Sequence, residues 1–156
     1  MPKTRTQEVA RLHGLVGRTI DRVHVEAHAF KGVVDPGPPI RLYLRLSETE
    51  YVCIGCGADG ESLYWDESLP EPVDMEESGE IVIADRTNQP PWFQVNSRTV
   101  ESVAVMRSPE GGAIEGIKLE FGDGRRVLVV NNGDEFWIDD EYPPGTSQND
   151  WAVELC

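Results

Sequence analysis

The sequence lacks any hydrophobic run long enough to cross a bilayer, because no apolar stretch approaches the roughly 20 residues that a membrane helix needs. Residues 1–14 begin with basic side chains but contain no apolar core of the kind found in secretory signals. We therefore expect a cytoplasmic protein with no membrane partner. The 156 residues, 39% hydrophobic and 27% charged, are enough for one compact domain spanning residues 1–156.

Cysteine is also scarce. The three cysteines are Cys53, Cys56 and Cys156. An odd, low number without an export signal predicts reduced thiols in a bacterial-type cytosol, not a disulfide framework.

Lysine and arginine are missing from two long stretches. Residues 46–85 contain twelve Asp or Glu and no Lys or Arg, and residues 127–156 contain seven acids and no base. The formal net charge of the chain is −14. Such a field repels nucleic acid and anionic lipid, and it attracts a basic protein partner and speeds the encounter. The simpler alternative is that the acidity only keeps the protein soluble.

Four segments of the first half recur in the same order in the second half. They are "GRTIDRVHV" (17–25) with "SRTVESVAV" (97–105), "IRLYL" (40–44) with "IKLEF" (117–121), "YVCIGCG" (51–57) with "VLVVNNG" (127–133), and "LYWDE" (63–67) with "FWIDD" (136–140). The offset between the matches falls from 80 to 77, 76 and 73, so the second half has shorter loops. The chain therefore predicts two similar β units, at about 17–67 and 97–141.

The periodicity within these segments favours strands. Residues 40–46 alternate between apolar and other side chains with a period of two, while the unbroken apolar run at 127–130 predicts a strand buried on both faces. Asp123 lies between two glycines in a predicted hairpin turn. The only predicted helix is at the start, where Val9, Leu12 and Val16 have helical spacing.

These elements predict an all-β fold with a short N-terminal helix. Two pseudo-repeated four-strand units form a sandwich or a partly open barrel around a shared core, because one unit alone would expose its apolar face. We also expect a short strand at 80–84 and an extended tail at 151–156.

A tetrahedral zinc site is one interpretation of Cys53 and Cys56 with His24 and His28, because two Cys and two His are a common ligand set. The alignment of the two halves places Val129 and Asn132 at the cysteine positions, so the second half has no such ligands. We therefore predict no metal and no cofactor, with Cys53 as a small core residue.

Aromatic side chains stand beside carboxylates at two predicted strand ends. Paired carboxylates serve as acid and base in some enzymes, and they also bind divalent cations. A third interpretation is a surface that grips a basic protein, with the ring in a pocket and the acids paired to Lys or Arg. The predicted partner-binding residues are Trp65, Asp66, Glu67, Trp137, Asp139, Asp140 and Glu141. The alternative is that both tryptophans are core residues and the acids solvate the strand ends.

The "LVGRTIDRV" opening, the alternating "IRLYLRL" strand and the Trp-Asp-Glu strand end resemble small immunity-like proteins of bacterial polymorphic toxin systems. This resemblance implies an inhibitor that neutralises a basic partner such as a toxin or a nuclease. The residues themselves favour a binding protein over an enzyme, because no nucleophile and base stand in a recognisable pattern. A small enzyme or ligand-binding protein that uses the Asp and Glu clusters remains an alternative, as does a self-associating structural subunit. The oligomeric state stays open.

Overall fold

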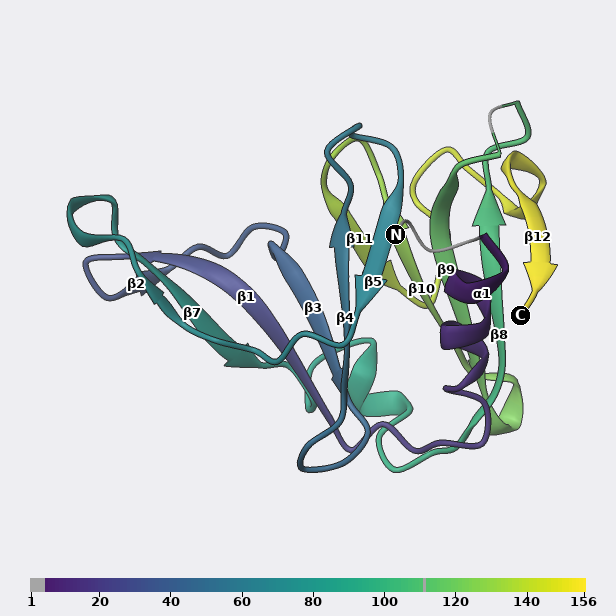
Figure 1. The fold of residues 1–156 in the computed structure, drawn as a ribbon, viewed down its shortest axis with the longest axis horizontal. Helices are drawn as coiled ribbons and strands as arrows, with labels where there is room; N and C mark the ends of the chain where they lie inside the picture. The colour runs from purple at the N-terminus through teal and green to yellow at the C-terminus, as the bar shows by residue number, and fades with distance from the viewer. Residues whose placement is uncertain (1–4, 111) are drawn as a thin grey trace.

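The computed structural model of the protein describes residues 5–110 and 112–156 and shows two antiparallel sheets with one α-helix, α1 (Arg5–His13) (Figure 1). Four short 3₁₀ turns interrupt the loops, and they are η1 (Glu76–Ser78), η2 (Trp92–Gln94), η3 (Gly122–Gly124) and η4 (Gln148–Asp150). The predicted all-β fold with a short N-terminal helix is therefore confirmed. Within the described residues, no helix is both long enough and apolar enough to span a membrane.

The first sheet is built on a four-strand meander. Its strands are β1 (Arg22–Phe30), β3 (Arg41–Arg45), β4 (Tyr51–Cys56) and β5 (Leu63–Asp66), and each pairs with the next in an antiparallel manner. The second sheet contains the same meander, made of β8 (Val100–Arg107), β9 (Ile114–Phe121), β10 (Arg126–Asn131) and β11 (Phe136–Asp139). The "IRLYL" and "IKLEF" segments contribute the second strand of each meander, as the internal repeat predicts.

Each sheet is larger than the predicted four strands. Three further strands extend the first sheet to seven, namely β2 (Val33–Val34), β6 (Val73–Asp74) and β7 (Glu80–Asp85). Strand β12 (Ala152–Leu155) joins β8 and brings the second sheet to five strands. The two sheets do not close into a barrel.

The strand register corrects the alignment of the two units. Leu44 stands between Val23 and Val52 in the first sheet, as Leu119 stands between Val103 and Val127 in the second. The offset is therefore 75 in the second and third strands, not 77 and 76. In the second strand the error is two residues, and a shift of two preserves the alternation along a strand. In the third strand the error is one residue, and a strand that is apolar on both faces does not reveal such a shift. The sequence pattern alone therefore could not fix either offset.

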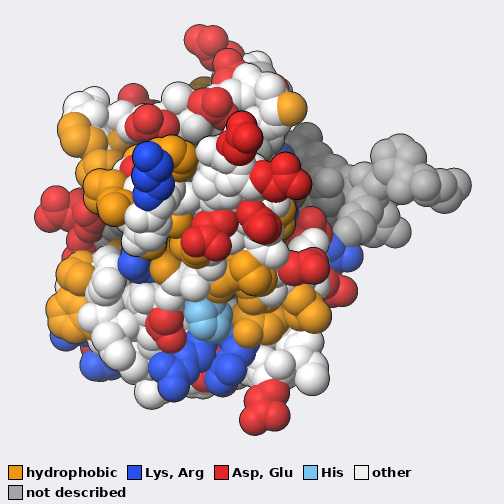
Figure 2. All heavy atoms as spheres, turned by 90° about the vertical axis from the view of Figure 1, so that its left-hand side faces the viewer, with side chains coloured by type: hydrophobic (Ala, Val, Ile, Leu, Met, Phe, Trp, Pro, Cys, Tyr) orange, Lys and Arg blue, Asp and Glu red, His pale blue; other side chains and the backbone are white. Residues whose placement is uncertain are grey.

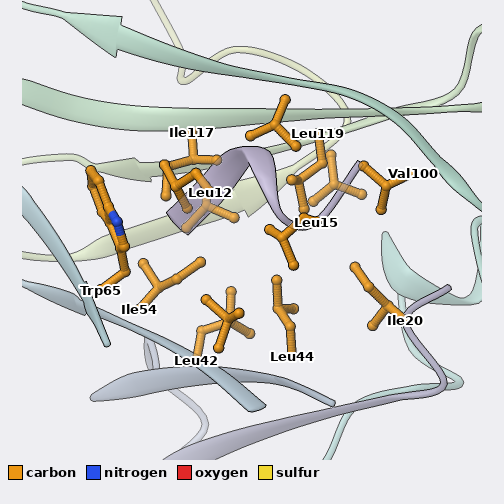
Figure 3. Packing of buried hydrophobic residues seen from close by; sticks show 14 of the residues in the cluster. Leu12, Leu15, Ile20, Leu42, Leu44, Ile54, Trp65, Val100, Ile117 and Leu119 are labelled. Atoms are coloured by element: carbon orange, nitrogen blue, oxygen red, sulfur yellow. The ribbon is translucent and has the colours of Figure 1, made fainter. Parts of the chain in front are cut away.

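The core lies between the sheets and is filled from equivalent positions of the two meanders (Figure 3). The paired contributors are Val23 and Val103, Val25 and Val105, Leu42 and Ile117, Leu44 and Leu119, Val52 and Val127, and Ile54 and Val129. Helix α1 and the turn after it add Leu12 and Leu15, which are fully buried. The shared core explains why neither meander stands alone, since each would expose one apolar face to water.

One contact joins the start of the two units directly. Thr19, just before β1, forms an antiparallel bridge with Thr99, just before β8, and the two threonines are equivalent in the repeat. An antiparallel pair has a local two-fold axis between its members. The backbone N–H of Val100 donates to the carbonyl of Arg18 at 2.9 Å and strengthens this junction.

Candidate functional site

The end of β5 carries three of the predicted partner-binding residues. Trp65 is only 9% exposed and packs in the main core beside Ile54 (Figure 3). Asp66 is half-buried on the outer face of the sheet, opposite Cys53, and the exposed Glu67 forms a 3.8 Å ion pair with Arg11. Trp65 is therefore a core residue, as the alternative to a partner-binding role predicts, while Asp66 and Glu67 lie near the surface.

The end of β11 carries the other four. Trp137 is half-buried and packs with Met106, Leu128 and Val130, a smaller cluster on the outer face of the second sheet. Its indole N–H donates to the carbonyl oxygen of Glu141 at 2.8 Å. The two tryptophans are not equivalent, because the register makes Ile138 the counterpart of Trp65 and Tyr64 the counterpart of Trp137. Trp65 therefore lies on the inner face of its sheet, in the core, and Trp137 lies on the outer face of its sheet.

The carboxylates after β11 are engaged with the backbone and with each other. The Asp139 carboxylate accepts a 2.6 Å hydrogen bond from the backbone N–H of Asp140. Its hydrogen bond to the Asp140 carboxyl, together with desolvation and the neighbouring charge, raises the pKa of Asp140 above its usual range. The guanidinium of Arg126 donates to the carbonyl oxygen of Asp140 at 2.8 Å and so holds this turn against the sheet.

The four residues of the hypothetical zinc site do not converge. Cys53 pairs with Tyr43, which pairs with His24, so a tyrosine separates the thiol from the imidazole. His28 contacts the carbonyl oxygen of Ser78 at 2.6 Å instead. Burial raises the pKa of the Cys53 and Cys56 thiols to about 11, which opposes the thiolate that a metal requires. Among the described residues, no three His, Cys, Asp or Glu side chains gather into a metal-binding group.

One buried carboxylate on the first sheet, Glu26, is not among the predicted partner-binding residues. Glu26 is 8% exposed, and it accepts a 2.5 Å hydrogen bond from the Tyr43 hydroxyl. Burial and this bond raise the pKa of Tyr43 well above its usual range, and Arg41 lies 3.7 Å from the same carboxylate. The three side chains satisfy one another on the outer face of the sheet, which explains how a charge tolerates burial there.

Five exposed large hydrophobic residues, Phe30, Val33, Val34, Val73 and Met75, lie on a part of the first sheet that projects away from the second (Figure 1). We call this part, made of residues 26–34 and 73–85, the arm. The outer face of the arm carries the apolar side chains of Phe30, Val33, Val73, Ile81 and Ile83, which we call the apolar strip. Two polar side chains share this face, because His28 stands opposite Ile81 and Glu26 stands opposite Ile83. Phe30 is 47%, Val33 70% and Val73 50% exposed. No other layer of the described chain covers the strip.

Acidic side chains surround the tip of the arm. Asp74, Glu76, Glu77 and Glu80 line an open cavity of about 580 Å³ together with Ala29, Phe30, Lys31, Gly32 and Gly79. None of these four acids forms an ion pair within the described residues. The Lys31 ammonium lies over the Phe30 ring, 5.3 Å from its centroid. Figure 2, which looks at this end of the molecule, shows the acidic side chains beside exposed hydrophobic ones.

Local contacts hold the tip in place. The His28 contact to Ser78 ties the turn before β7 to β1. Gly79 has φ of +98° and lies directly against the Ala29 carbonyl, so any side chain at this position would collide with β1. The acidic turn therefore stays at the edge of the strip.

The arm is the surface that sequence reasoning missed. Pro70 and Pro72 predict a loop over residues 70–79, but the structure forms β6 at Val73–Asp74 within it. Strands β2 and β6 have two residues each, too few to show alternation. The available signal was the clustering of acids around short apolar pairs, "VV" at 33–34 and "VDM" at 73–75.

Comparison with known proteins adds no relative: no family model, no curated protein and no solved structure matches the chain.

Proposed function

We propose that this protein is an acidic protein-binding module of the cytoplasm that inhibits a basic partner of the toxin or nuclease class. The observation that supports this function is the arm, where four carboxylates without ion pairs stand beside exposed apolar side chains. Interfaces bury an apolar centre inside a polar rim, and a rim of one charge selects a partner of the other.

The charge distribution favours fast association. The acids that end β5 and β11 add to the field of the arm, and residues 46–85 contain no basic side chain to offset it. A basic partner that approaches this field associates faster than a neutral one, and the rate falls as salt screens the charges. An inhibitor of a harmful enzyme benefits from such a rate because the partner must be captured before it acts.

Like charge opposes the alternative of self-association through the same surface. Two copies that meet at the arm would bring eight carboxylates of Asp74, Glu76, Glu77 and Glu80 together, against two ammonium groups of Lys31. Repulsion of this kind disfavours a symmetric contact at neutral pH.

The test begins with capture of the partner from a lysate of the native host on the immobilised protein. The identified partner is then purified, and association and dissociation rates are measured from low to high salt. We expect a basic partner, an association rate that falls steeply with salt, and loss of the partner's activity in the complex. A partner of acidic or neutral charge, a salt-independent association rate, or full activity in the complex would contradict the proposal.

A further inference from the structure

We infer that the apolar strip of the arm docks an amphipathic basic helix of the partner, with one cationic side chain of that helix in the cavity at the tip. This inference rests on the proposed function and names the surface that performs it. Three observations support it: the strip is exposed, acidic side chains lie near it, and prolines at the edge of the sheet oppose the addition of a strand.

The strip is a sheet face without a covering layer. In the second sheet, the outer-face residues Met106, Leu128 and Val130 are covered by Tyr142 and Trp151 of the same chain. The strip has no such cover among the described residues, although Val33 and Val73 expose half of their surface or more. Sheet faces of this composition are stable when a helix or a second sheet buries them.

The edge of the arm disfavours a strand as the occupant. Strand β6 has only two residues and forms the outer edge of the sheet, and Pro70 and Pro72 precede it. Proline lacks the backbone N–H that an added strand would need, and it protects edges in this way. The partner therefore lies across the face. Four strands at a spacing of roughly 4.8 Å make the strip about 14 Å wide, which matches about ten residues of helix.

Charge selects the sign of the partner. The cavity at the tip joins the strip at Phe30, which lines both. Glu76 and Glu77 reach this cavity from the turn before β7, and Asp74 and Glu80 reach it from the other face of the sheet, because they alternate with Val73 and Ile81. The Lys31 ammonium over the Phe30 ring shows that the ring accepts a cation in this geometry. Because the Lys31 ammonium already lies over this ring, a guanidinium or ammonium group of the partner would meet the carboxylates that line the cavity. The helix must therefore carry Lys or Arg beside its apolar side chains.

The test uses a synthetic peptide of about fifteen residues with Leu at helical spacing and Lys or Arg on its flanks. The control peptides are a scrambled sequence of the same composition and a version with Glu in place of the bases. Binding to the ¹⁵N-labelled protein is followed by NMR. We expect shifts at residues 28–33 and 73–83, and weaker binding of both control peptides. Shifts centred elsewhere, such as the cavity that Arg11 and Leu69 line beside α1, would overturn the inference.

Variants separate the strip from general charge. The double variant Val33→Ser and Val73→Ser should weaken peptide and partner binding about tenfold, since two exposed valines lose their burial in the complex. The matched control, Val153→Ser and Leu155→Ser, changes two equally exposed apolar residues on β12 and should leave affinity within about twofold. Because all four side chains are exposed, circular dichroism should show intact folding for both.

The outcomes distinguish this inference from the proposed function. A partner that binds in a salt-dependent manner, but equally well to the strip variant and the control variant, would reject the strip and leave the proposed function in place. A captured partner that is not basic would reject both.

Discussion

The outer faces of the two meanders share a backbone pattern but differ in their side chains and in what covers them. The pairs of equivalent positions are Glu26 and Met106, Tyr43 and Lys118, Cys53 and Leu128, Gly55 and Val130, and Tyr64 and Trp137. The first face carries one carboxylate, two tyrosines, a cysteine and a glycine at these positions, while four of the five residues on the second face are large and apolar. The inner positions of both meanders are apolar, because they share one core. The two units thus have similar side chains at the inner positions, where they contact each other, and different side chains at the outer positions.

The path of the chain after the fourth strand explains this difference. After β11, Tyr142 and Trp151 fold over the outer face and stack on each other with ring centroids 5.9 Å apart. The guanidinium of Arg126 lies 5.0 Å from the Tyr142 ring and adds a cation–π contact. After β5 the chain turns towards α1 instead, where Glu67 meets Arg11. At these equivalent positions, the apolar outer face therefore belongs to the meander that has a cover.

The largest expected loss of stability comes from removing a side chain of the shared core, and the two tryptophans allow a direct comparison. Trp65→Ala should destabilise the protein by about 3–5 kcal/mol, because the indole fills the main core. Trp137→Ala should cost about half as much, because this ring is half-buried in the smaller outer cluster. Urea denaturation measures both values. Equal losses would show that the outer cluster matters as much as the core.

The next effect removes the cover of the second unit. Trp151→Ala should cost about 2 kcal/mol, since it deletes the stack on Tyr142 and a 3.2 Å hydrogen bond from the indole N–H to the Glu115 carboxylate. It should also increase binding of a hydrophobic dye, because Met106 and Leu128 lose part of their cover. Tyr64→Ala, on the uncovered first face, is the control. A larger increase in dye binding for this control would contradict the role of the cover.

A smaller effect concerns pH and the thiols that only the first unit has. Burial raises the pKa of Cys53 from about 9 to about 11, and its counterpart is Leu128, which does not titrate. A raised pKa means that the folded state keeps the proton longer than the unfolded state. The stabilising contribution is therefore complete below about pH 9 and is lost between about pH 9 and 11.

The loss from Cys53 should be on the order of 2 kcal/mol. The measurement is the unfolding free energy across this pH range for the wild type and for Cys53→Ala, because the difference between the two curves removes the titration of Tyr and Lys. Parallel curves would mean that the buried thiol ionises as easily as a free one.

The smallest effect sharpens the comparison at the two acidic strand ends. Charge reversal at Asp139 and Asp140 removes the hydrogen bond that the Asp139 carboxylate accepts in the turn. Apart from that loss, the reversal should change the free energy of unfolding by less than about 0.5 kcal/mol. Glu67→Gln should also change it by less than about 0.5 kcal/mol. Both changes should slow association with the basic partner at low salt, and the double reversal should do so more strongly. Reversal of Glu76 and Glu77 on the arm is the matched comparison and should slow association most, because these acids line the cavity at the tip of the arm. Rates that ignore all three changes would leave the acidity with a role in solubility alone.

The sequence predicted the meanders because alternation and the internal repeat report the same strands twice. Leu42 and Leu44 in the first unit, and Ile117 and Leu119 in the second, face the core as their spacing indicated. The sequence could not fix the register. A shift of two residues keeps the alternation of the second strand, and the third strand is apolar on both faces, so a shift of one residue also leaves apolar side chains inward.

The candidate surface was predicted only in its charge. Trp65 and Trp137 both precede carboxylates in the sequence, yet one ring fills the core and the other packs on the outer face of the second sheet. The strand register decides this, because Trp65 pairs with the inward Ile54 and Trp137 with the outward Val130. The arm escaped prediction because two-residue strands such as β2 and β6 carry no period. Their position depends on pairing with residues distant in sequence, such as Ile81 opposite Val73.

The bridge between Thr19 and Thr99 has a consequence for how the two halves assemble. Equivalent residues that meet across a local two-fold axis are the signature of an isologous contact between separate subunits. Here residues 67–97 connect the halves, so each half meets the other at an effective concentration on the order of millimolar, whatever the amount of protein in the cell. Assembly of the shared core does not weaken on dilution, as it would for two separate chains. Because the halves are parts of one chain, their sequences can also differ. One half can have a covered outer face and the other an arm, whereas two copies of one short chain would have to be identical.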